Sequence, residues 1–125
     1  MAEHQGWVVA EVSDTGDPTA VLEAVTGANP GQVRGQREES RVVFYDDGVA
    51  TTSVEPALST VSEHLDRVVI VESFEGGMGE TVSRYYEVGD EGLGDPVDEL
   101  ESVSRWFVES HFDYYTARYG VDGGI

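Results

Sequence analysis

Cysteine and lysine are both absent from this chain of 125 residues, and basic residues of any kind are scarce. Without cysteine there is no disulfide framework, no thiol nucleophile and no zinc site built from thiolates. The seven basic residues are all arginine and stand against 25 aspartates and glutamates, which leaves a formal net charge of −18. This balance makes nucleic acid an unsuitable partner, because phosphate binding requires a concentrated positive patch.

Long apolar runs are also missing. No stretch approaches the ~20 apolar residues that a membrane-spanning helix needs. Residues 1–6 lack the basic region and the apolar run of a signal peptide. We therefore expect a cytoplasmic protein without a membrane partner. Its length fits a single domain, 1–125, around one hydrophobic core.

The distribution of the acidic residues indicates an acidic shell around a folded domain. Apolar residues make up 39% of the chain and aromatic residues 10%, and they are patterned, which is not typical of disorder. Separate carboxylates repel one another, and the Debye length shrinks from about 30 Å at 0.01 M salt to about 3 Å at 1 M. A spread acid excess without lysine resembles the proteome style of extremely halophilic archaea (haloarchaea), so we expect a halophilic protein. A single acidic protein from a mesophile is the alternative.

The hydrophobic pattern alternates between strand and helix periods. Alternation predicts strands at 7–13 and 81–88. A continuous apolar run of β-branched residues predicts a strand at 68–75, and a turn signal at 46–48 predicts a hairpin of the strands 41–45 and 49–53. A capping Asp17, followed by Pro18, predicts a short first helix that Gly27 closes. Helical spacing predicts a second helix over 54–65. The segment 29–40 is predicted to be a loop.

The last helix is predicted to be long. Asp95 and Pro96 repeat the signal of a cap followed by proline, and acidic residues follow near the positive end of the helix. Two neighbouring apolar stripes then extend to about Tyr119. We therefore predict a C-terminal helix over 95–119, wide enough in its apolar face to pack on a sheet, a helix or a second subunit.

The predicted order of elements defines an α+β fold. Its first six elements are βαββαβ, the split arrangement of a ferredoxin-like antiparallel sheet. An additional strand and the long C-terminal helix follow. The predicted ferredoxin-like core covers 6–90, and right-handed crossovers place both short helices on one face of the sheet.

Short motifs in the middle of the chain carry a resemblance to a known family. They are Thr51, Ser53 and Pro56 before the second helix, Glu72 and Phe74 on a strand, and Gly77, Met78 and Gly79 at a turn. With these motifs the segment resembles the ferredoxin-like domain of uncharacterised phage- and plasmid-encoded proteins of the Api type. Thr52 stands where that family has tryptophan. The resemblance covers 6–90 and implies a fold, but no activity.

Residues for catalysis or metal binding do not form a known pattern. The Gly-x-Gly at 77–79 is flanked by glutamates and precedes no helix, which argues against a phosphate cradle. The acidic loops at 14–17 and 90–95 do not match a calcium-binding loop. His4, His64 and His111 lack the spacing of a zinc site. We assign no catalytic residue, metal or cofactor, and consider an enzyme less suitable than a binding domain.

Two surfaces remain as candidate sites. Aromatic residues of the last predicted helix form a candidate interface with a protein partner or in a homodimer, although packing in the core also explains them: Trp106, Phe107, Phe112, Tyr115 and Tyr119. Glu72, Glu75 and His64 are candidate residues of a pocket between the sheet and this helix. The sequence thus favours a non-enzymatic domain that binds a protein or itself. A small-molecule-binding or catalytic domain with that pocket is the alternative.

Overall fold

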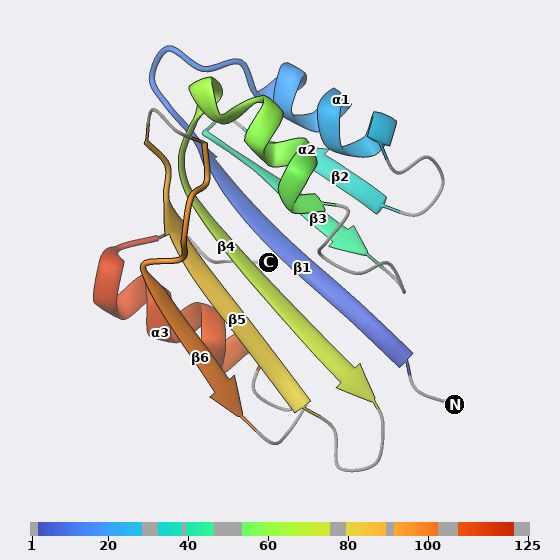
Figure 1. The fold of residues 1–125 in the computed structure, drawn as a ribbon, viewed down its shortest axis with the longest axis vertical. Coiled ribbons are helices and arrows are strands. Elements are labelled where there is room, and N and C mark those ends of the chain that lie inside the picture. Colours follow the sequence, from blue (N-terminus) through green and yellow to red (C-terminus); the bar gives the residue numbers. More distant parts are fainter. Residues whose placement is uncertain are drawn as a thin grey trace.

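A computed structural model describes residues 3–28, 33–38, 40–46, 54–75, 80–89, 92–102 and 108–121. Within these ranges the chain forms an α+β fold in which six antiparallel strands make one sheet (Figure 1). In spatial order the strands are β2 (Val33–Arg37), β3 (Arg41–Asp46), β1 (Glu3–Val12), β4 (Leu65–Glu75), β5 (Glu80–Glu87) and β6 (Asp98–Ser102). The helices in the described ranges are α1 (Pro18–Ala28), α2 (Val54–Thr60) and α3 (Val108–Tyr119), and a short 3-10 turn, η1 (Ser62–His64), precedes β4.

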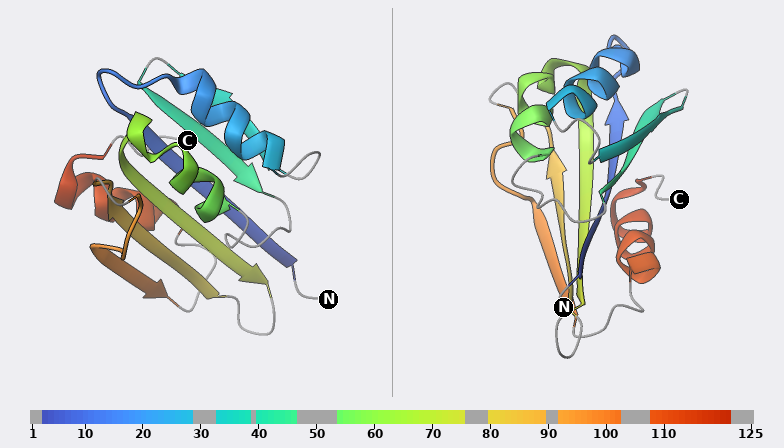
Figure 2. Two further views of the ribbon diagram at one scale, coloured as in Figure 1. Left: turned by 45° about the horizontal axis from the view of Figure 1, so that its top comes forward. Right: turned by 90° about the vertical axis from the view of Figure 1, so that its right-hand side faces the viewer.

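The helices lie on both faces of the sheet. Figure 2 shows α1 and α2 together on one face and α3 on the opposite face. Alternate residues of the central strands therefore enter two separate cores. Val8 and Ile70 belong to the core beneath α1 and α2, whereas Val9, Val69 and Val71 belong to the core beneath α3. Because β1 and β4 are covered on both faces, their apolar runs are nearly continuous.

The turn from β1 into α1 is tight because it packs against η1. A β-carbon on Gly16 would lie 2.3 Å from the carbonyl oxygen of His64, a distance that no side chain can occupy. Ser13 N–H donates to that same carbonyl at 2.9 Å. The first helix then begins as predicted, with the Asp17 side chain accepting from Thr19 N–H at 3.0 Å.

Two of the predicted elements are wrong. The predicted helix 95–119 is divided, because 98–102 is strand β6 and the helix occupies only 108–119. The predicted loop 29–40 contains strand β2. Two strands, β5 and β6, thus follow α2 and β4 in place of the one additional strand predicted. The predicted strand 49–53 and the Gly77–Gly79 turn lie outside the described residues.

The reason for both errors is that pairing within the sheet overrides local pattern. Leu100 fits a helical spacing with Val97, but on β6 it turns towards the core beneath α3, and Val97 is 51% exposed. In β2 only Val33 is buried, and the other four residues are exposed. This edge strand therefore has no alternation of apolar and polar residues from which it could be predicted.

Candidate functional site

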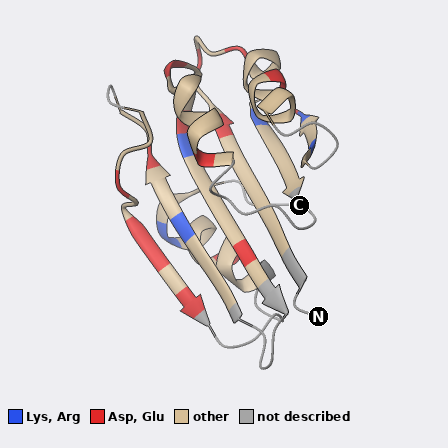
Figure 3. Cartoon of the chain, turned by 45° about the vertical axis from the view of Figure 1, so that its right-hand side comes forward, with Lys and Arg blue, Asp and Glu red and all other residues tan. Residues whose placement is uncertain are grey.

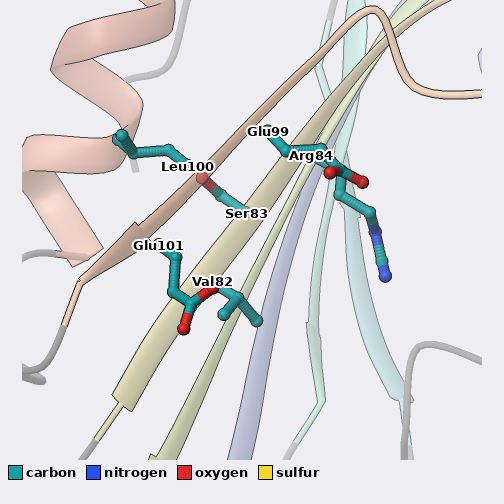
Figure 4. Close-up of a pocket in the computed structure, with 6 residues that line it drawn as sticks. All are labelled: Val82, Ser83, Arg84, Glu99, Leu100 and Glu101. Carbon is teal, nitrogen blue, oxygen red and sulfur yellow. The ribbon is translucent and has the colours of Figure 1, made fainter.

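An open pocket of about 450 Å³ lies over β5 and β6 (Figure 4). It is lined by Val82, Ser83, Arg84, Glu99, Leu100 and Glu101. The strand register places Arg84 opposite Glu99 and Val82 opposite Glu101. Both glutamates are exposed, so β6 supplies two carboxylates to this pocket and β5 supplies its one lining cation. Figure 3 shows acidic residues along β6 beside the single basic position on β5.

Arg84 joins the pocket to two further carboxylates on the same face of the sheet. Its Nη2 atom lies 2.7 Å from Oε1 of Glu55 on α2 and 3.4 Å from Oε2 of Glu72 on β4. The Tyr86 hydroxyl donates to the same Glu55 oxygen at 3.0 Å, and burial raises the pKa of Tyr86. Arg84 thus forms ion pairs with Glu55 and Glu72, and two further carboxylates, those of Glu99 and Glu101, line the same pocket, so four negative groups stand against one positive group on this surface.

A second polar cluster lies on the opposite face, between β5 and α3. The Ser83 hydroxyl is 2.5 Å from Nδ1 of His111 and 2.8 Å from the hydroxyl of Tyr115. A serine bonded to a histidine is the first requirement of an activated nucleophile. Here, however, Ser83 is 3% exposed and His111 is 1% exposed. Although Ser83 also lines the open pocket, its hydroxyl is bonded to two buried side chains, those of His111 and Tyr115, and is not presented to a substrate.

This buried cluster is suited to holding α3 on the sheet. Burial lowers the pKa of His111, which favours the neutral imidazole, and a neutral imidazole has one ring nitrogen that donates a hydrogen bond and one that accepts. A neutral hydrogen-bonded chain of Ser83, His111 and Tyr115 carries no uncompensated charge into the core. The hydrogen bonds from Ser83 on β5 to His111 and Tyr115 on α3 thus give these polar residues a structural role in the contact between helix and sheet.

Asp98 on β6 provides a further attachment for α3. Its Oδ2 atom accepts from the hydroxyls of Tyr114 and Tyr119, both at 2.8 Å, and Nε of Arg118 lies 3.5 Å away. The hydrogen bonds from the two tyrosines, first that of Tyr114, lower the pKa of Asp98. Strand β6 and helix α3 are thus joined by charge-assisted hydrogen bonds.

The aromatic residues predicted as an interface divide into two groups. Phe112 and Tyr115 are 4% and 0% exposed and pack on the chain's own sheet. Tyr119 is partly buried there, with its ring stacked on Tyr85 at a centroid distance of 4.1 Å. These three side chains therefore support the core beneath α3 in this structure. Trp106 and Phe107 lie outside the described residues.

The candidate pocket residues are not brought together. His64 accepts a hydrogen bond from Asp17 N–H through Nδ1 at 3.0 Å, at the start of β4. Glu72 lies eight residues further along this strand, which corresponds to about 26 Å at about 3.3 Å per residue. Glu72 also belongs to the face of α1 and α2, opposite to α3. The side chain of Glu75 lies outside the described residues.

Sequence reasoning missed the acidic pocket because its residues also suit a helix. The predicted C-terminal helix has Glu99 and Glu101 near its start, where acidic residues are favourable. Only the pairing of β6 with β5 sets these residues beside Arg84. The alternation of polar and apolar residues at Glu99, Leu100 and Glu101 has the period of a strand and could have indicated β6.

The part of the chain that the structure describes contains neither a metal-binding cluster nor a membrane-spanning helix. Among its residues, no three histidines, aspartates or glutamates are grouped so that they could hold a metal ion. Within the same ranges, none of the helices has the length and apolar character to cross a membrane.

Comparison with known proteins gives no further guide to this site. The chain matches no family model, no curated protein and no solved structure.

Proposed function

We propose that this protein is a non-enzymatic, halophilic protein-interaction domain built on a ferredoxin-like core of the Api type. The spatial order β4, β1, β3, β2 supports such a core, because it is the order that a split βαββαβ unit takes. The position of α1 and α2 on one face of these strands supports it as well. Strands β5 and β6 with α3 extend the core at one side.

The contact surface that we propose is the acidic pocket over β5 and β6. The observation that carries the proposal is its charge: Glu99 and Glu101 are exposed there, whereas the lining Arg84 is engaged with Glu55 and Glu72. A partner with arginine side chains at strand spacing would supply the missing positive charge. An enzymatic role has less support, because the Ser83–His111 pair is buried and is not presented to a substrate.

A peptide titration tests this proposal. The probe is a short synthetic peptide in which arginine alternates with valine. During the titration, the backbone amide signals of the protein are recorded by NMR at the lowest KCl concentration that keeps the protein folded. We expect amide shifts on β5 and β6, and a loss of affinity of at least about fivefold in the variant Glu99→Gln/Glu101→Gln.

A matched variant separates local charge from total charge. Glu23→Gln/Asp66→Asn removes the same number of negative charges at exposed positions of α1 and β4, and it is expected to keep the affinity of the unmodified protein. Equal losses in both variants, or shifts confined to other elements, would contradict the proposed contact surface.

A further inference from the structure

The two edge strands of the sheet carry charges of opposite sign. Strand β2 presents Arg34 and Arg37, both exposed, and strand β6 presents exposed Glu99 and Glu101. Each of these strands pairs with one neighbour, so each leaves one row of backbone donors and acceptors without a strand partner in the described structure. Figure 1 shows β2 and β6 at opposite borders of the sheet.

Among the described residues, the arginines of β2 are distinguished by having no carboxylate as an ion-pair partner. Arg41, Arg67, Arg84 and Arg118 each form an ion pair with an aspartate or glutamate. Within the described ranges, neither of the two β2 arginines does so, although the chain has 25 acidic residues. Arg37 instead donates a hydrogen bond to the Thr19 hydroxyl. The chain has seven basic residues in all, and two of them stand exposed on one edge strand without an ion pair to any described carboxylate.

We propose that the protein associates with further copies of itself, head to tail, by pairing strand β6 of one copy with strand β2 of the next. This inference rests on the proposed function and names its partner. Opposite charges favour pairing between β2 and β6. Like charges disfavour the pairing of β2 with a second β2, and of β6 with a second β6. A closed dimer through one edge is therefore disfavoured, and the contact is heterologous.

The direction of the strands permits this contact. In the sheet as described, the six strands are antiparallel to their neighbours, so the two edge strands run in opposite directions. A second copy in the same orientation consequently brings its β2 antiparallel against β6, with the helices of both copies on matching faces. The antiparallel ladder then continues from one copy to the next, as in the addition of a strand to a sheet edge.

The side chains also match across the proposed contact. Arg37 lies opposite Val42, and Glu99 lies opposite Arg84, so both lie on the face covered by α1 and α2. A register that keeps the faces aligned can set Arg37 of one copy opposite Glu99 of the other, with Glu101 as its diagonal neighbour. The arginine would then enter the acidic surface described above.

The expected strength follows from the length of the edges. Both β2 and β6 have five residues, so the interface is small and belongs to the weak, transient class below about 1,200 Å² of total buried area. We expect association that grows with protein concentration, becomes measurable at roughly 0.1 to 1 mM, and extends beyond a dimer because it does not close.

Charge reversal at each edge tests the proposal in sedimentation velocity. The variants Arg37→Glu and Glu99→Arg each place like charges at the opposed positions 37 and 99, so each alone is expected to remain monomeric. An equimolar mixture restores opposite charges at every junction and is expected to regain at least half of the association of the unmodified protein. Glu23→Arg, on exposed α1, changes the charge as Glu99→Arg does and is expected to associate normally. Far-ultraviolet circular dichroism verifies that each variant is folded.

The outcomes separate this inference from the proposed function. An unmodified protein that stays monomeric up to about 1 mM, or association that neither reversal weakens, overturns head-to-tail pairing. A mixture that stays monomeric while the unmodified protein associates also overturns it. The arginine–valine peptide is titrated separately into monomeric Arg37→Glu, which keeps the acidic pocket. Binding there would preserve the proposed function even if self-association fails.

Discussion

His111 makes the stability of this fold depend on pH in a defined range. Its imidazole is 1% exposed, and burial lowers its pKa below the ordinary value of 6.5. In the unfolded chain the same group gains its proton near pH 6.5. As the pH falls below that value, the unfolded state binds a proton that the folded state excludes, and the free energy of unfolding decreases.

The size of this effect follows from proton linkage. One proton bound only by the unfolded state costs about 1.4 kcal/mol per pH unit. This loss begins as the pH passes below about 6.5 and ends at the lower pKa of the folded protein, whereas above about pH 7.5 His111 contributes no pH dependence. Protonating His111 in place would also put a charge beside Ser83 and Tyr115 in the core beneath α3.

The variant His111→Asn isolates the contribution of this residue. Asparagine retains an acceptor near the position of Nδ1 but does not titrate. We expect urea unfolding in about 2 M KCl, between about pH 5 and 8, to show a slope that is smaller in the variant by up to about 1.4 kcal/mol per pH unit. In proton NMR the His111 imidazole should take up its proton only at a pH below the ordinary midpoint of about 6.5. Equal slopes in both proteins, or an imidazole that titrates at its ordinary pKa, would refute the reasoning.

Three further expectations concern the stability of the fold. Gly16→Ala should lower the free energy of unfolding by about 1 to 3 kcal/mol, because its β-carbon would lie 2.3 Å from a backbone oxygen. Gly27→Ala should raise the free energy of unfolding by about 0.5 to 1 kcal/mol, because open space surrounds this position of α1. Urea unfolding measures both variants, and equal effects would contradict this expectation. Asp98→Asn should lower the free energy of unfolding by about 1 to 3 kcal/mol. It should also increase amide hydrogen exchange in α3 more than in α1, and an equal increase in both helices would contradict this expectation. Near-ultraviolet circular dichroism should show tertiary structure gained between about 0.1 and 2 M KCl, and a melting temperature independent of salt would argue against a halophilic protein.

The sequence could predict those elements whose local pattern and burial agree. The apolar runs of β1 and β4 and the capping Asp17 specify their own structures, because the residues that favour a strand or a helix start are also the ones buried or bonded there. The same agreement makes the α+β class, with two helices between strands, predictable from the hydrophobic pattern alone.

The candidate site depended on contacts that the sequence does not display. Glu99 and Leu100 are compatible with a helix, and they form a strand because β5 offers an open edge on which Leu100 can be buried. His64 and Glu72 are both polar residues next to apolar segments, which suggested one pocket, but a length of strand separates them.

The chain alone determined its acidity, its lack of cysteine and lysine, and the strands and helices whose residues repeat with a regular period. Tertiary structure decided which face of the sheet each helix covers, that Ser83 and His111 meet in the core, and that opposite charges occupy opposite borders. Local periodicity is encoded by neighbours along the chain, whereas these features arise between residues brought together only when the strands pair, and the free energy of that pairing outweighs local preference.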